Sequence, residues 1–82
     1  MHFRERVDWN RMAKVRSTAD IGAAIRSRRR ELGYTQADLA ERVGVGTTYL
    51  SNLENGKETA EIGKALHILM MLGMDLFVEV RS

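Results

Sequence analysis

The sequence predicts a mainly α-helical domain that is followed by one C-terminal β-strand. Its 82 residues include no proline, and proline is the residue that most strongly interrupts helices. Apolar residues recur at intervals of three and four between residues 17 and 72, which is the spacing of a buried helix face. From residue 74 onward the period changes to an alternation that is typical of a strand.

Composition limits the class of protein. A length of 82 residues fits one domain close to the lower limit for a self-sufficient core, and 44% hydrophobic residues argue against disorder throughout. The absence of cysteine excludes a disulfide framework and a thiolate metal site. No apolar run approaches the ~20 residues that span a bilayer, and the charged N-terminus lacks the apolar core of a signal peptide. We therefore expect a cytoplasmic protein that does not enter a membrane.

Residues 1–16 form a basic N-terminal arm. Residues 1–31 contain nine lysines and arginines against four acids, whereas residues 32–82 contain four against seven. Charge alone does not decide between phosphate contact and a solvated helix face. The arm either contacts DNA or a partner, or it is a tail with Trp9 packed against the domain, and we favour the tail.

Two helices are expected before residue 44. The first begins at Ser17, which has the spacing of a capping box with Asp20, and it ends at Gly33. Apolar residues follow at helical intervals inside it. Thr35 is the expected N-cap of the second helix, with Gln36 in the first turn.

The segment QADLAERVGVGTTYLSNLEN has the spacing of two short helices that cross at a tight turn. Leu39 and Val43 form the buried face of the first helix, and Leu50 and Leu53 form that of the second. Gly44 follows the last periodic residue and can adopt the left-handed conformation that ends a helix.

The outward face of the second of these helices carries only short, uncharged side chains that form hydrogen bonds: Thr47, Thr48, Ser51, Asn52 and Asn55. A helix-turn-helix presents such a face to the major groove of DNA. The residues themselves therefore predict a DNA-binding function.

A further helix is expected from Thr59 to about residue 72, closed by Gly73. It has two apolar stripes: Ile62, Leu66 and Leu69 form the stripe expected to face the core, and Ile68, Met71 and Leu72 form a second one. A helix that is apolar on two sides has more surface to bury than one small core accepts. The surplus indicates a subunit interface.

The predicted strand, residues 74–81, has no partner in its own chain unless the N-terminal arm supplies one, and unpaired strand edges are avoided. The simplest partner is the same strand of a second subunit, antiparallel across a twofold axis. The expected homodimer interface consists of Met71, Leu72, Leu76, Val78 and Val80. Phe77 lies on the opposite face, where it could cover the sheet or meet another protein.

The run GYTQADLAERVGVGTTYLSNLENGK, residues 33–57, resembles the helix-turn-helix of phage-repressor-like regulators of the XRE type. The resemblance is close over these residues and looser over residues 17–72. It implies a lambda-repressor-like DNA-binding domain of four or five helices over residues 17–73, followed by a dimerisation strand over residues 74–82. One departure is Gly46, where this family more often has Ser or Thr as a helix N-cap, and glycine caps more weakly by roughly a few tenths of a kcal/mol.

The resemblance also implies roles for single residues. It assigns the contacts to DNA bases to Thr47, Thr48, Ser51 and Asn52. It assigns contacts to DNA phosphates to Gln36 and Asn55, and Lys57 and Arg26 would add positive charge. Arg29 and Glu54 occupy positions that form an ion pair, the alternative being two independent surface charges. The implied partner is a palindromic operator in double-stranded DNA, bound by a homodimer.

Within this family, the compact size, the four helices and the terminal strand together resemble HipB-like antitoxins. Such antitoxins pair their C-terminal strands between subunits, repress their own operon and hold a HipA-type kinase toxin inactive. The resemblance therefore implies a transcriptional repressor with a kinase toxin as partner. Alternatives are a controller protein of a restriction-modification operon, a small phage repressor, or a protein-interaction module that mainly neutralises a toxin.

No residue pattern indicates an enzyme, a cofactor, a metal site or a small-molecule ligand. His67 is flanked by apolar residues, and His2 offers no second ligand at a useful spacing. The chain has no Ser/His/Asp set, and the glycines of the G-V-G sequence at residues 44–46 belong to the turn between the two short helices.

Overall fold

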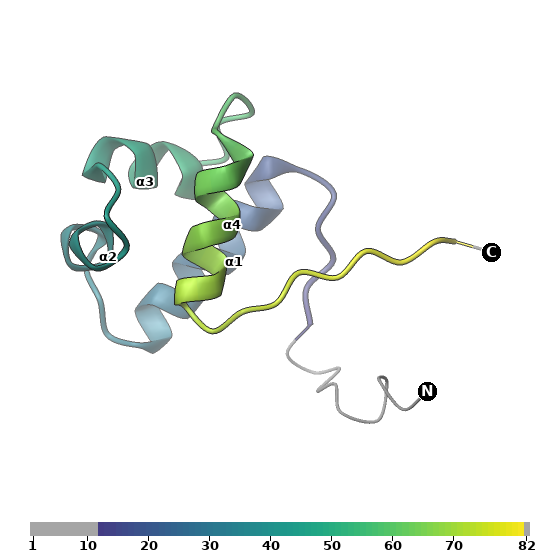
Figure 1. Ribbon diagram of the computed structural model, residues 1–82, viewed down its shortest axis with the longest axis horizontal. Coiled ribbons are helices and arrows are strands. Elements are labelled where there is room, and N and C mark those ends of the chain that lie inside the picture. The colour runs from purple at the N-terminus through teal and green to yellow at the C-terminus, as the bar shows by residue number, and fades with distance from the viewer. Residues whose placement is uncertain (1–11, 82) are drawn as a thin grey trace.

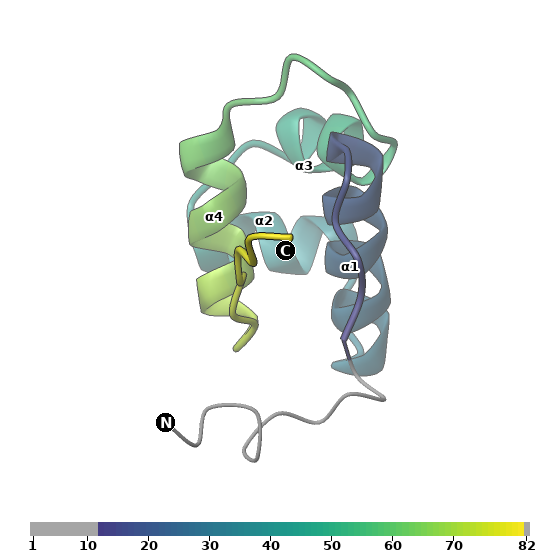
Figure 2. The same ribbon diagram turned by 90° about the vertical axis from the view of Figure 1, so that its right-hand side faces the viewer.

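A computed structural model describes residues 12–81 of the chain. It contains four helices, α1 (Thr18–Glu31), α2 (Gln36–Val43), α3 (Thr47–Glu54) and α4 (Ile62–Met71). Helices α1 and α4 each contact the α2–α3 pair, α1 through α3 and α4 through α2 (Figures 1 and 2). The predicted mainly helical fold is confirmed, with four helices in the described part of the chain.

The helix ends follow from local sequence. The hydroxyl of Ser17 accepts a hydrogen bond from the Asp20 N–H at 3.2 Å, and Asp20 in turn accepts from the Arg16 N–H at 2.8 Å. Thr35 and Asp38 form a complete capping box, with both bonds at 3.0 Å. These bonds occupy N–H groups that a helix start otherwise leaves without partners. The N-caps predicted at Ser17 and Thr35 are both confirmed.

The three glycines that were expected to end helices, Gly33, Gly44 and Gly73, all adopt the left-handed conformation, as does Gly56, with φ between 73° and 81°. The turn between α2 and α3 shows the purpose of this geometry. With Gly44 left-handed, its N–H and that of Val45 both donate to the Ala40 carbonyl at 3.0 Å. The chain thereby reverses within three residues and brings α3 across α2.

The core lies where all four helices meet. Its largest fully buried side chains are Ile25, Leu39, Leu50, Leu53 and Ile68. The predicted inward faces of the helix-turn-helix are confirmed, because Leu39, Val43, Leu50 and Leu53 are all buried. Burial of each such side chain contributes about 1.5–3 kcal/mol relative to exposure.

Helix α4 differs from the prediction in its start and in its buried face. It begins at Ile62, not at Thr59, because residues 57–60 form a turn in which the Ala60 N–H donates to the Lys57 carbonyl at 3.2 Å. The side chains that face the core are Ala65, Ile68, Leu69 and Leu72, whereas Ile62 and Leu66 are 59% and 41% exposed. The small Ala65 takes the place in the core that the prediction gave to these two larger residues.

Leu72, which was expected at a subunit interface, is buried in the core of its own chain at 3% exposure. The guanidinium of Arg28 in α1 reinforces this arrangement, since its Nε donates to the Leu72 carbonyl at 3.1 Å. The C-terminal end of α4 is therefore fixed to α1.

Residues 74–81 leave α4 as an irregular segment that runs away from the helices (Figure 1). No strand occurs among residues 12–81, because a strand needs a pairing partner and the helices of one chain offer none. Pairing of this segment with a second subunit stays a prediction. The predictions for Trp9 and for most of the basic arm fall on residues 1–11, which lie outside the described residues.

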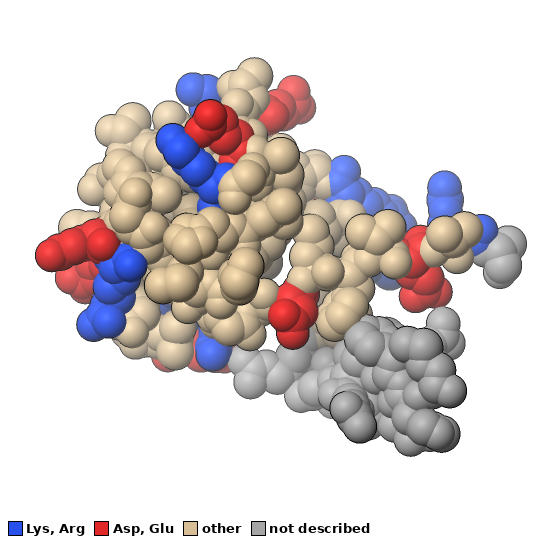
Figure 3. Space-filling model, viewed as in Figure 1, with Lys and Arg blue, Asp and Glu red and all other residues tan. Residues whose placement is uncertain are grey.

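The apolar surface over α4 and the character of the helices are both relevant to function. Over α4 the molecule shows a broad area with few charged side chains (Figure 3), which includes the exposed Ile62, Leu66, Met70 and Met71. None of the helices within residues 12–81 has the length and apolar character to cross a bilayer.

Candidate nucleic-acid interface

Helix α3 has one buried and one open face. Leu50 and Leu53 point into the core, and the opposite face carries Thr47, Thr48, Ser51, Asn52 and Asn55, all of which are exposed or half-exposed. Gly46 is the N-cap, with extended backbone and no side-chain hydrogen bond. The first turn of α3 therefore presents backbone N–H groups as well as threonine hydroxyls to whatever approaches this face.

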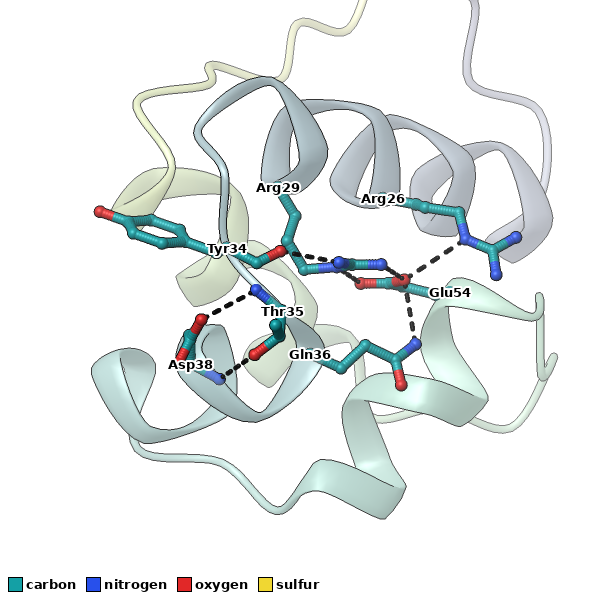
Figure 4. A network of polar contacts seen from close by, with 7 residues as sticks. All are labelled: Arg26, Arg29, Tyr34, Thr35, Gln36, Asp38 and Glu54. Carbon is teal, nitrogen blue, oxygen red and sulfur yellow. Dashed lines mark hydrogen bonds and ion pairs between the residues drawn. The ribbon is translucent and has the colours of Figure 1, made fainter.

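The Glu54 carboxylate is the centre of a polar network behind this face (Figure 4). Its side chain is fully buried, and Arg29 of α1 donates to both of its oxygens, at 2.8 Å from Nε and 2.9 Å from Nη2. Arg29 also donates from Nη1 to the Tyr34 carbonyl at 2.8 Å. The structure thus joins the end of α3 to α1 through a bidentate pair.

Two residues assigned to phosphate contact converge on the same carboxylate. The Gln36 amide donates to Glu54 Oε1 at 3.1 Å, and Arg26 Nε lies 3.6 Å from that oxygen. This convergence of Gln36 and Arg26 on Glu54 was not predicted from the sequence. A signal for it exists, since a buried carboxylate has about four lone-pair sites and one arginine fork fills only two.

The charges in the network stabilise one another. Burial raises the pKa of Glu54, but hydrogen bonds from Arg29 and Gln36 and the charges of Arg29 and Arg26 outweigh it, so the net pKa lies below the usual value. The hydrogen bond to Glu54 raises the pKa of Arg29. Both partners are therefore ionised at neutral pH, and no buried side-chain N or O atom of the described residues is left without a hydrogen bond.

The other groups assigned to phosphate contact surround α3. Arg26 keeps its terminal nitrogens directed away from Glu54 (Figure 4), and its side chain is 44% exposed. Asn55 is exposed at the C-terminal end of α3, and Lys57 is exposed just beyond it. The Lys57 N–H donates to the Asn52 carbonyl at 3.0 Å, which places this lysine directly beside the face of α3.

The surface around α3 is suited to a polyanion that presents hydrogen-bonding groups in a groove between its phosphates. Uncharged hydrogen-bonding side chains occupy the middle of the surface, and donors from α1, α2 and the segment after α3 flank it. Phosphate contacts position a protein on a duplex, and contacts to base edges give specificity. Within residues 12–81 no group of three His, Asp or Glu residues could hold a metal ion.

Comparison with known proteins agrees with this geometry. A family model described as helix-turn-helix matches residues 25–76. An uncharacterized HTH-type transcriptional regulator, y4mF of Sinorhizobium fredii, is 46% identical over 66 residues, which cover 79% of this chain and 87% of that protein. The ImmF control region 10 kDa protein of Bacillus phage phi105 is 33% identical over 58 residues, or 71% of this chain and 64% of that protein.

Solved structures of HipB have the same fold. A complex of a HipB variant with the O2 20-mer superposes with a TM-score of 0.76 and 25% identity, covering 87% of this chain and 99% of that one. HipB in a HipA-HipB-O2-O3 complex gives a TM-score of 0.75 at 24% identity, covering 87% and 100% of the two chains. From its family match, its relatives and its fold, the chain belongs to the XRE-type helix-turn-helix family of transcriptional regulators.

Proposed function

We propose that the protein is a sequence-specific transcriptional repressor that reads bases in the DNA major groove with the open face of α3. The observation that carries this proposal is the uncharged, hydrogen-bonding surface of Thr47, Thr48, Ser51 and Asn52, held from behind by the buried Arg29–Glu54 pair. Asparagine can pair bidentately with adenine, and threonine methyl groups suit the thymine methyl. Because these side chains are short, sequence-dependent DNA shape contributes to specificity.

We assign the phosphate contacts to Gln36, Asn55, Lys57 and Arg26. Lys57 and Arg26 supply positive charge, and Gln36 lies at the N-terminus of α2, where backbone N–H groups also attract anions. Glu54 accepts from Gln36 and lies beside Arg26, so the network that fixes α3 also orients two of these groups.

Mutations of base-reading residues and of phosphate-contacting residues should have different effects on DNA affinity. Asn52→Ala is expected to weaken binding to the preferred duplex by roughly 1–3 kcal/mol and to relax the preference at the bases it contacts. Lys57→Ala is the matched control, because it removes charge from the same surface and should weaken all duplexes about equally. Fluorescence anisotropy with preferred and scrambled duplexes measures both effects. An unchanged preference in Asn52→Ala would show that Asn52 does not read bases.

We further propose that the repressor is a homodimer on a palindromic operator, with its C-terminal segments paired. Val78 and Val80 are 92% and 89% exposed, and Leu76 and Met71 are 42% and 54% exposed, which is an unusual amount of apolar surface for so small a chain. The proposed interface keeps Met71, Leu76, Val78 and Val80 and omits Leu72, which is buried in its own core. Two recognition helices of such a dimer would contact half-sites about 34 Å apart.

Deletion of residues 75–82 tests the dimer. The truncated chain is expected to be mainly monomeric and to keep its helices, because the core residues of α1 to α4 all precede the deletion. DNA affinity should fall because two half-sites are no longer bound as one unit. Sedimentation velocity measures the oligomeric state. A truncated protein that stays a tight dimer would place the interface on the helices and favour the controller-type alternative.

Within this function, we propose the role of an antitoxin that represses its own operon and neutralises a kinase toxin. The support is the likeness to HipB over nearly the whole HipB chain, together with solved HipB complexes that include HipA. The relative from phage phi105 favours a phage regulator as the second candidate. Co-expression with the product of the adjacent gene decides between them, since an antitoxin should relieve growth arrest caused by that product and a phage regulator should not.

A further inference from the structure

Tyr49 is the one aromatic residue of α3, and it points away from the base-reading face. It is half-buried, whereas its sequence neighbours Thr48 and Leu50 are exposed and buried, respectively. Its hydroxyl donates to the Glu61 carbonyl at 2.7 Å. Lys64 lies 5.3 Å from the ring centroid and pairs with Glu61 at 2.9 Å. Tyr49 therefore connects the first turn of α3 to the residue that N-caps α4.

The loop between these two helices, residues 55–61, is fixed at both ends. At its beginning Gly56 packs against α1 so closely that a Cβ there would lie 2.9 Å from the Ala19 Cβ, and the Lys57 N–H is bonded to α3. At its end the Glu61 side chain makes no capping bond, and the Tyr49 hydroxyl bonds the Glu61 carbonyl and so ties this end of the loop to α3. The exposed Lys57 lies within this closed loop.

We propose that Tyr49 is a positioning residue for the DNA backbone, because its hydroxyl fixes the 55–61 loop on α3 and so holds Lys57 beside the phosphates that flank the bases contacted by Asn52. This inference rests on the proposed DNA-binding function and adds a residue to it. A lysine on a fixed loop loses less conformational freedom on binding than one on a mobile loop. Burial raises the pKa of the Tyr49 phenol, so the hydroxyl remains a donor at neutral pH.

Tyr49→Phe tests the inference, because it keeps the ring and removes only the hydrogen bond. Affinity is expected to fall roughly three- to tenfold, the range typical of one hydrogen bond. The loss should be equal for preferred and scrambled duplexes, and the slope of log affinity against log salt should become shallower by about one, as for one lost phosphate contact. Anisotropy titrations over a range of salt concentrations give all three quantities.

Tyr34→Phe is the matched control. Tyr34 is the other tyrosine of the chain, and its ring lies 4.5 Å from the Arg42 guanidinium carbon, away from the polar network in Figure 4. Removal of its hydroxyl should leave both affinity and salt slope unchanged. A double-mutant cycle provides the second readout, since Tyr49→Phe should have no further effect once Lys57 is replaced by alanine.

Each outcome of this experiment is informative. An unchanged salt slope in Tyr49→Phe, or a full additional loss in the Lys57→Ala background, would overturn the positioning role. A loss confined to the preferred duplex would overturn it as well, because Tyr49 would then act on base reading. Failure of the proposed function is distinguishable, since the wild-type protein itself would then bind no duplex in a salt-dependent way.

Discussion

Replacement of Glu54 by alanine is expected to lower the free energy of unfolding by about 3–5 kcal/mol, the usual cost of leaving a buried charge without its partner. The stranded charge is Arg29, whose side chain is only 9% exposed, and the Gln36 amide loses its acceptor at the same time. Since small domains are stable by about 5–15 kcal/mol in total, this one change should remove much of the stability. Urea unfolding followed by circular dichroism measures it.

The double variant Arg29→Met/Glu54→Leu is the matched control. It leaves no uncompensated charge, so it should be less destabilised than Glu54→Ala even though it changes two buried residues. Its remaining cost comes from the Tyr34 carbonyl, which loses the Arg29 donor, and from the Gln36 amide, which loses the Glu54 acceptor. A Glu54→Ala protein within about 1 kcal/mol of the wild type would mean that the pair behaves as a surface salt bridge, contrary to its burial.

The same carboxylate predicts a pH dependence. Its folded pKa lies below the ordinary value of 4.5, so its contribution to stability is fully present above that value and is lost as the pH falls through the folded pKa. Unfolding experiments in acid should therefore show a decline in stability that is reduced in Glu54→Gln. Equal declines in the two proteins would assign the acid sensitivity to other carboxylates.

Gly22→Ala is expected to have the second-largest effect, a loss of about 3 kcal/mol at the upper end of the usual cost of overpacking. A Cβ at this position would lie 2.0 Å from the Leu53 carbonyl oxygen and 3.0 Å from the Glu54 Cα. Both of these are backbone atoms, so α1 and α3 must separate to make room. That movement would also disturb the pair of Glu54 with Arg29.

Gly63→Ala is the control for this substitution. Gly63 also lies inside a helix, but a Cβ there meets nothing within 4 Å, and alanine is the better helix former by about 1 kcal/mol. Thermal unfolding should therefore show a protein that is at least as stable as the wild type. If both alanine variants were equally stable, the close approach of α1 to α3 would not be essential to the fold.

The parts of the fold that the sequence predicts correctly depend on neighbouring residues. Thr35 and Asp38 cap α2 across three positions, and Gly44 ends it through its own backbone conformation. The inward positions of Leu50 and Leu53 follow from helical periodicity. In each case the determining interaction lies within about one helical turn of the residue, so the pattern is visible in the linear sequence.

The features that the sequence does not reveal depend on contacts between distant segments. In the sequence, Gly22 looks like any glycine inside a helix. Only the structure shows that a Cβ at this position would lie 2.0 Å from the Leu53 carbonyl oxygen of α3. Gln36 was assigned to phosphate alone, because its bond to Glu54 joins residues 18 positions apart. The choice of Ala65 over Leu66 as the core residue of α4 depends on where α1 and α2 stand, and periodicity cannot distinguish two adjacent apolar faces.

Protection of DNA from dimethyl sulfate tests most directly whether α3 lies in the major groove. This reagent methylates guanine N7, which faces the major groove, and adenine N3, which faces the minor groove. On a duplex selected by the protein from a random pool, we predict protection of guanine N7 in two clusters about 34 Å apart, with the same protection reached only at higher protein concentration in Asn52→Ala. Protection of adenine N3 alone, or no protection of guanine N7 at saturating protein, would show that α3 does not lie in the major groove.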